Sequence, residues 1–196
     1  MELRLSLFAI LPNKSAHMRG VILIGGIHGV GKSTAVKKLT EKFSIPNYTA
    51  SKIIKDMKNI TSEDSTKLTS DIENNQKLLI NGIQRILNDH DTFLLDGHFT
   101  LLNADSKIER IDIEVFKQLS IKGILLLQET AKIIHNRLLS RDGKSISLEL
   151  ISNYQIAEEN HAENIAGYLD IPIKKICNYN DNDLFIAFES LQSSVR

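Results

Sequence analysis

The chain has 196 residues, of which 42% are hydrophobic and 24% charged, values ordinary for a single globular domain with a substantial core. Its 24 basic residues balance 24 acidic ones, so no overall positive field exists to hold nucleic acid or an anionic membrane surface. The single cysteine excludes an internal disulfide, and no apolar stretch reaches the ~20 residues that span a bilayer. We therefore expect a cytoplasmic protein without a membrane or nucleic-acid partner.

The first 18 residues form an N-terminal extension of uncertain role. Residues 3–11 are apolar-rich and precede Pro12 and a short polar stretch. A secretory signal is disfavoured, because only Arg4 supplies positive charge and Ser6 breaks the apolar core. The alternatives are an amphipathic addition that packs on the domain and a dispensable extension before Met18. We expect one domain over residues 19–196.

A continuous apolar run over residues 21–24 predicts a buried strand that leads into a glycine-rich loop. The loop matches the phosphate-binding pattern G-x-x-x-x-G-K-[ST], and helical apolar spacing follows it to residue 43. Strand, loop and helix together indicate a nucleoside triphosphate site. We assign nucleotide binding to Gly26, Ile27, His28, Gly29, Val30, Gly31, Lys32, Ser33 and Thr34.

Two side chains of this P-loop carry the expected chemistry. Lys32 should reach the β- and γ-phosphates, and the Ser33 hydroxyl should ligate Mg²⁺. Backbone N–H groups and the positive end of the helix dipole complete an anion site. The expected cofactors are therefore ATP and Mg²⁺.

Beyond this helix the chain alternates strands and helices, which is typical of a parallel sheet covered on both faces. We expect a short strand over 45–50, a helix that Ser51 could cap, and a long helix from a capping box at 70 to about 88. A strand over 92–96, a short helix over 112–119 and a strand over 123–127 follow. Thr130 and Ser147 should cap the next two helices.

The C-terminal part should supply the last strand, over 171–176, and a final helix over 183–191. Pro172 favours an edge position for this strand. Cys177 follows the same apolar run, which predicts a buried structural thiol. The expected fold is a three-layer α/β/α P-loop domain.

Asp96 ends the strand over 92–96, and ligands of such sheets sit beyond the carboxyl ends of the strands. Its carboxylate could hold the Mg²⁺ hydration shell or accept a proton from an attacking hydroxyl. Many hydrolytic P-loop motors carry a glutamate directly after this aspartate, whereas Gly97 follows here. Asp96 followed by Gly97 therefore favours a phosphotransferase over a motor. His98 could contact substrate or simply pack.

Arg137 and Arg141 lie four residues apart near the end of a predicted helix, and so share one face. With Gly143 as a hinge, they suit a short lid over residues 137–146 that neutralises charge on a moving phosphoryl group. The alternative is a solvated basic helix end favoured by the helix dipole.

Three segments resemble the archaeal-type adenylate kinases and related small P-loop ATP-binding proteins of the AAA group: residues 22–34, Leu94-Leu95-Asp96-Gly97-His98 and residues 136–142. The resemblance implies a parallel sheet of five strands in the order 2-3-1-4-5, with MgATP in the P-loop. It implies catalytic roles for Lys32, Asp96, Arg137 and Arg141, with Ser33 and Asp96 at the metal. It also implies that residues 178–181 lie near the adenine, with Asn178 and Asn180 as contacts.

One departure bears on the acceptor. Adenylate kinases of this kind hold the acceptor monophosphate with arginine from the region between the second and third strands, but residues 48–84 contain none. Lys52, Lys58 or Lys67 lacks the planar two-pronged grip of arginine, which weakens AMP as the acceptor. The sequence thus predicts a nucleoside/nucleotide kinase-like phosphotransferase that acts on a small-molecule acceptor or a protein partner. The alternative is a slow ATPase that acts as a switch or assembly factor on protein or RNA.

Overall fold

A computed structural model describes residues 19–61, 72–103, 105–143 and 145–194. The N-terminal extension, Lys67 and the capping box expected at residue 70 therefore lie outside the described residues. Within the described part of the chain, no helix is long and apolar enough to cross a membrane.

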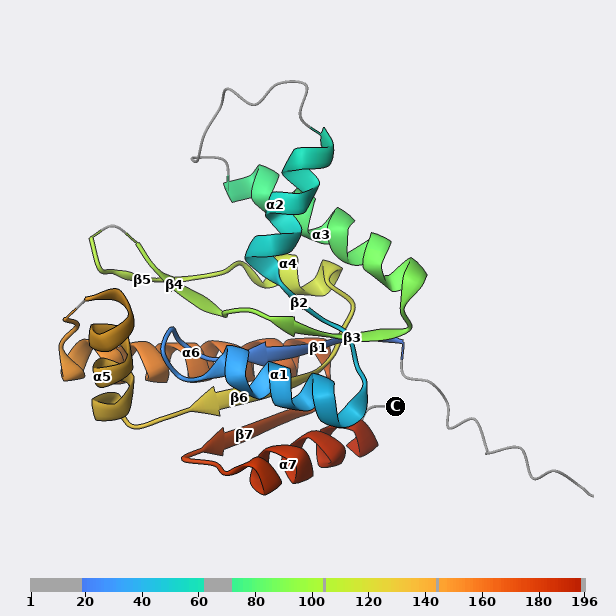
Figure 1. Cartoon of the computed structure of the whole chain (residues 1–196). Coiled ribbons are helices and arrows are strands. Elements are labelled where there is room, and N and C mark those ends of the chain that lie inside the picture. Colours follow the sequence, from blue (N-terminus) through green and yellow to red (C-terminus); the bar gives the residue numbers. More distant parts are fainter. Residues whose placement is uncertain (1–18, 62–71, 104, 144, 195–196) are drawn as a thin grey trace, which may run out of the picture.

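Strands and helices alternate along most of the described chain (Figure 1). In chain order they are β1 (Gly20–Gly25), α1 (Lys32–Phe43), β2 (Asn47–Thr49), α2 (Ala50–Thr61), α3 (Ile72–Asp89), β3 (Thr92–Asp96), β4 (Thr100–Leu102), β5 (Ile108–Arg110), α4 (Ile113–Gln118), β6 (Ile121–Gln128), α5 (Ala131–Asp142), α6 (Leu148–Leu169), β7 (Ile173–Cys177) and α7 (Asp181–Ser194).

The main sheet has five parallel strands in the order β2-β3-β1-β6-β7. Counted within this sheet alone, that is the expected order 2-3-1-4-5, and β7 lies at the predicted edge. The register places Ile24 of β1 opposite Asp96 of β3, and Asp96 in turn opposite Thr49 of β2. The carboxyl ends of three neighbouring strands therefore meet where the P-loop begins, at the left of Figure 1.

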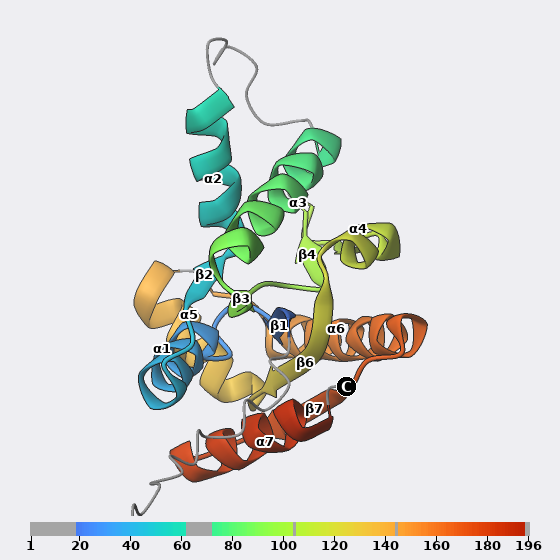
Figure 2. The ribbon, with the colours of Figure 1, turned by 90° about the vertical axis from the view of Figure 1, so that its right-hand side faces the viewer.

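Alternate residues of the central strands pack into two apolar clusters, one on each face of the sheet. Leu23 and Leu95 belong to the cluster that contains residues of α2, α3, α4 and α6. Ile24 and Leu94 belong to the cluster with residues of α1, α5 and α7. Figure 2 shows these layers from the side. The structure thus has the three-layer α/β/α fold that the sequence predicts.

Helices α2 and α3 pack closely against each other at one end of the molecule (Figure 1). Gly82 of α3 makes the close approach possible, because a Cβ there would lie 2.2 Å from Ile53 Cγ2 of α2. The pair is connected to the sheet by β2 and β3, and therefore forms one wall beside the P-loop.

Sequence reasoning missed an antiparallel hairpin, formed by β4 and β5, which projects beside the P-loop end of the sheet (Figure 1). Each of its strands has only three residues, too few to show an alternating pattern. The hairpin follows β3 directly, so it lies over the carboxyl ends of the parallel strands.

The predicted caps of α5 and α6 are confirmed, because Thr130 Oγ1 accepts from Ile133 N and Ser147 Oγ accepts from Leu150 N. The predicted cap of α2 is wrong. The helix begins at Ala50, one residue before Ser51, and the Thr49 hydroxyl accepts from Lys52 N instead.

The prediction of a buried thiol is also wrong, since Cys177 is exposed. It ends the edge strand β7, whose Lys175 is exposed on the same side two residues earlier. Ile173 packs against one apolar cluster and Ile176 against the other, but Cys177, at the end of the strand, belongs to neither.

Candidate functional site

The P-loop connects β1 to α1, as the motif predicts. Gly26 opens it with φ 136°, and a Cβ there would lie 2.6 Å from the carbonyl oxygen of Leu127 in β6. Only glycine fits such a backbone at such a distance from a neighbouring strand. Helix α1 then begins at Lys32, with its first N–H groups at the loop.

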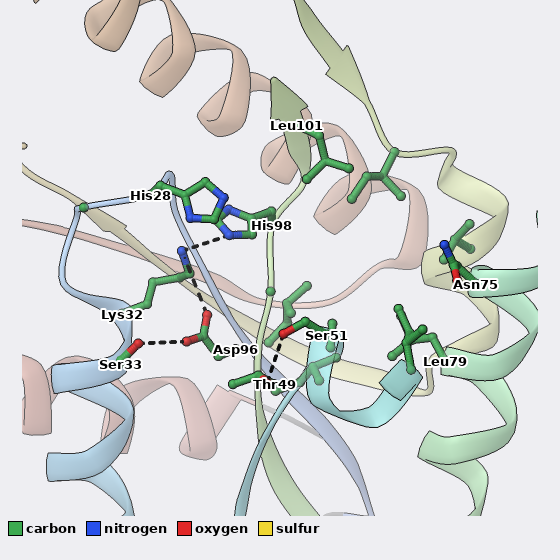
Figure 3. A pocket seen from close by; sticks show the side chains of 18 of the residues that line it. His28, Lys32, Ser33, Thr49, Ser51, Asn75, Leu79, Asp96, His98 and Leu101 are labelled. Carbon is green, nitrogen blue, oxygen red and sulfur yellow. Dashed lines mark hydrogen bonds and ion pairs between the residues drawn. The ribbon is translucent and has the colours of Figure 1, made fainter. Parts of the chain in front are cut away.

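The ammonium group of Lys32 lies at the P-loop side of the site, beside Asp96 and His98 (Figure 3). Its Nζ donates to the carbonyl oxygens of Gly26 at 2.7 Å and Ile27 at 3.3 Å, and lies 3.9 Å from Asp96 Oδ1. Burial lowers the pKa of Lys32 from 10.5 to about 8, although the carboxylates of Asp96 and Glu158 oppose this shift. The site therefore holds a cation that is largely removed from water.

Ser33 and Asp96 come together as the expected metal pair. Ser33 Oγ donates to Asp96 Oδ2 at 3.4 Å, and burial raises the pKa of this carboxyl against the effects of Lys32 and Ser33 (Figure 3). A hydroxyl and a carboxylate are hard oxygen donors that suit Mg²⁺, which usually takes few protein ligands and completes its shell with water and phosphate. The described residues contain no group of three or more His, Cys, Asp or Glu that could form an all-protein metal cage.

Two histidines lie next to the ammonium group. The rings of His28 and His98 are 4.3 Å apart between centroids, and His98 Nε2 lies 3.4 Å from Lys32 Nζ (Figure 3). Burial, Lys32 and His28 together lower the pKa of His98 to about 2. His98 is therefore neutral and accepts a hydrogen bond from Lys32 through Nε2.

The two arginines of the predicted lid line the same cleft but have different partners. Arg137 Nη1 donates to the carbonyl oxygens of Gly29 at 3.2 Å and Val30 at 2.9 Å, which brings its guanidinium group onto the P-loop. Arg141 pairs with Asp142 through Nε and Nη2, at 2.8 and 2.7 Å. Only Arg137 therefore contacts the P-loop directly.

The two asparagines expected near the adenine are exposed, and neither lines the cleft. Asn180 caps α7, since its Oδ1 accepts from Asp183 N and its own N–H donates to Asp183 Oδ2. Tyr179 between them faces the P-loop instead, because its hydroxyl lies 3.7 Å from where a Cβ of Gly31 would be. The segment reaches the nucleotide end of the site through its tyrosine.

A cleft of about 1360 Å³ extends from the P-loop to a second wall. Figure 3 shows Lys32 and Asp96 on one side, with Asn75 and Leu79 of α3 on the other and Leu101 of the hairpin above. The second wall combines eight apolar residues with seven polar or charged ones, and so offers both apolar surface and hydrogen-bonding groups to a small molecule. Its residues are Thr49, Ala50, Ser51, Ile54, Asn75, Gln76, Leu79, Leu101, Glu109, Arg110, Ile111, Asp112, Val115, Phe116 and Leu119.

Among the charged residues that the sequence does not assign to this site are Arg110 and Glu158. Arg110, at the end of β5, is exposed and lines the second wall, whereas Arg85 of α3 lies 3.9 Å from Met57 Sδ and is not among the lining residues. Glu158 of α6 is buried and accepts hydrogen bonds beside the P-loop. Neither belongs to a recognisable motif, so only the three-dimensional arrangement reveals them.

A family model described as an AAA domain matches residues 25–152, which is more than half of the chain and includes the P-loop, Asp96 and Arg137. The chain belongs to this family. The predicted kinship with AAA-group ATP-binding proteins is thereby confirmed, while the matching AAA domain does not single out adenylate kinases. No curated protein matches the chain.

The fold of this AAA domain occurs in several solved structures. A sugar kinase from Janibacter sp. matches with a TM-score of 0.54 and 15% identity over 90% of this chain and 95% of the kinase. A gluconokinase from Sinorhizobium meliloti matches with a TM-score of 0.51 and 12% identity over 90% and 93%. An uncharacterized protein from Eubacterium ventriosum matches with a TM-score of 0.51 and 15% identity over 89% and 99%. These likenesses establish a P-loop kinase-like fold.

Proposed function

We propose that this protein transfers the γ-phosphoryl group of MgATP to a small-molecule acceptor, as nucleoside and nucleotide kinases do. The observation that carries the proposal is the cleft of about 1360 Å³ that joins the P-loop to a second wall of α2, α3, α4 and the hairpin. Hydrolysis needs only a water molecule beside the γ-phosphate. A cleft of this size, continuous with the donor site, suits a second substrate.

The residues around the P-loop support the donor half of the proposal. Lys32 would neutralise charge on the β- and γ-phosphates, exchanging its contacts with the loop carbonyls for phosphate oxygens. Ser33 and Asp96 would hold Mg²⁺, which supplies further positive charge at the transferring group. Positioning and electrostatic stabilisation provide most of the catalysis in this type of transfer.

Helix α5 would supply the mobile part of the site. Arg137 touches the P-loop carbonyls and has a second partner in Glu129, at 3.5 Å from Nη2 to Oε2. Arg141 would swing from its pair with Asp142 toward the phosphates as the lid over residues 137–146 closes. Tyr179 would contact the base of the nucleotide in place of the two asparagines beside it.

The acceptor end of the cleft favours an acceptor with a substantial apolar body. Leu79 and Leu101 line its wall, while Asn75 and Gln76 of α3 offer uncharged hydrogen-bonding groups. Arg110 provides the arginine that the stretch over residues 48–84 lacks, so a nucleoside monophosphate is again a candidate beside a neutral hydroxyl compound. The sugar kinase and gluconokinase share only the fold at 12–15% identity, so their acceptors do not carry over to this chain.

The test is transfer of label from γ-labelled ATP across a panel of nucleoside monophosphates, nucleosides and small hydroxyl metabolites, with Lys32→Ala as the control. We expect label on at least one acceptor with the wild type and none with the variant. Label that appears only as free phosphate, at the same rate with every acceptor, would refute the transferase. It would favour the switch or assembly ATPase instead.

A further inference from the structure

A glutamate is buried where the P-loop, the end of β3 and helix α6 meet. Glu158 is 1% exposed, and its neighbours one turn away on α6, Tyr154 and Ala162, are buried as well. A carboxylate in such a place is costly unless several hydrogen bonds satisfy it. The carboxylate of Glu158 therefore needs several donors around it.

The hydrogen bonds of Glu158 come from three backbone N–H groups and one hydroxyl. Oε1 accepts from Gly26 N at 3.2 Å and from Phe99 N at 3.0 Å. Oε2 accepts from Thr100 N at 2.7 Å, from Phe99 N at 3.1 Å and from the Thr100 hydroxyl. All these partners are donors, and a carboxylate is the side chain that accepts from both of its oxygens.

These bonds join the two halves of the cleft. Gly26 is the first residue of the P-loop, and while its N–H donates to Glu158, its carbonyl oxygen accepts from Lys32 Nζ at 2.7 Å. Phe99 and Thr100 lie at the start of the hairpin whose later residues, Leu101 and Arg110 among them, line the acceptor wall. One side chain therefore fixes the backbone that holds the donor lysine and the backbone that carries the acceptor wall.

A third group of the site lies beside the same carboxylate. His98 Nδ1 is 3.9 Å from Glu158 Oε1 and has no hydrogen-bond partner within the described residues, while His98 Nε2 faces Lys32. The carboxylate thus lies behind the ring that accepts from the lysine.

We infer that Glu158 is a positioning residue that clamps the first residue of the P-loop to the start of the β4–β5 hairpin, and so sets the donor lysine and the acceptor wall at a fixed distance. The inference rests on the proposed function for its catalytic consequence. Its structural content, the clamp on Gly26, is independent of which acceptor is used. Misplacement of reacting groups by about 1 Å can cost roughly a hundredfold in rate.

The test compares Glu158→Gln with two control variants. Glutamine keeps the shape but turns N–H donors toward the N–H groups of the clamp. Tyr154→Phe removes the 3.0 Å bond from the Tyr154 hydroxyl to the Thr100 carbonyl oxygen, at the same junction but away from the P-loop. Glu159→Gln removes one charge from the next residue, which pairs with Lys175.

Calorimetric titration with MgATP and thermal unfolding are measured for each protein. Glu158→Gln should raise the dissociation constant for MgATP by about tenfold or more. Tyr154→Phe should lower the Tm but leave the dissociation constant within about twofold of the wild-type value. Glu159→Gln should leave the Tm unchanged and the dissociation constant within the same twofold range. Equal MgATP affinity of folded Glu158→Gln and wild type would overturn the clamp. If the wild type itself does not bind MgATP, the proposed function fails instead.

Amide hydrogen exchange of the wild type tests the clamp even if Glu158→Gln does not fold. The amide hydrogens of Gly26, Phe99 and Thr100 should exchange slowly and lose protection together, because one buried carboxylate accepts from all three. Rapid exchange at Gly26 with slow exchange at the other two would overturn the inference.

Discussion

Replacement of Lys32 by methionine should stabilise the nucleotide-free protein while it abolishes the response to MgATP. Lys32 is only 7% exposed, and burial lowers the pKa of its ammonium group from 10.5 to about 8. At neutral pH this shift corresponds to about 3 kcal/mol of destabilisation by the protonated lysine. Methionine has a similar length and no charge, so it removes that cost.

The gain is reduced because the variant leaves Asp96 without the cation 3.9 Å away, so we expect a net stabilisation of about 1–3 kcal/mol. The difference depends on pH with a defined sign. Below about pH 8 both folded and unfolded chains carry the Lys32 proton, and the full cost is present. Between about 8 and 10.5 the folded wild type releases the proton first, so its stability approaches that of the variant as the pH rises.

The assay is urea unfolding of both proteins at pH 7 and pH 9.5, with and without MgATP. MgATP at about 100 times its dissociation constant should stabilise the wild type by about 2.7 kcal/mol and the variant by far less. A nucleotide-free Lys32→Met protein that is less stable than the wild type at pH 7 would refute the reasoning. It would mean that the contacts of Lys32 with the loop carbonyls outweigh its burial.

Four other substitutions test the packing and the site. Gly82→Ala places a methyl group 2.2 Å from a side chain of α2 and should lower the free energy of unfolding by about 1–3 kcal/mol. Gly167→Ala, with nothing within 4 Å of the new methyl group, should raise it by up to about 1 kcal/mol. Tm values that change alike in the two variants would contradict this. Gly26→Ala should abolish MgATP binding in calorimetry, because its methyl group would meet a β6 carbonyl at 2.6 Å. Arg137→Ala should lower the rate of γ-phosphoryl transfer by roughly a hundredfold while the fold is retained. An unchanged rate would exclude a catalytic role for Arg137.

The strands and the P-loop could be predicted because their signals are local. The strands β1, β3 and β6 are nearly unbroken apolar runs, and β3 has the predicted bounds Thr92–Asp96. The site residues beside the loop could also be predicted, because Lys32 and Ser33 belong to the motif and Asp96 ends a neighbouring strand. The structure brings these three side chains together.

The features missed from the sequence depend on contacts between distant segments. In the sequence, Glu158 is one charged residue among many on a long helix. Its partner Gly26 lies 132 residues away along the chain, so only the folded structure shows that the two are in contact. Arg110 reaches the cleft through a hairpin too short to predict. Cys177 was misjudged because it ends the edge strand, beyond the packed Ile173 and Ile176, where Lys174 and Lys175 already interrupt the apolar pattern.

The most direct test of the central claim, that the P-loop binds MgATP through Lys32, is a calorimetric titration of the wild type and Lys32→Met with MgATP. The urea unfolding experiments proposed above would show independently whether the variant is folded. We predict that the wild type binds and that the variant loses at least about tenfold in affinity, as expected when a charge-assisted contact to phosphate is removed. Equal affinity of the two proteins would contradict the account.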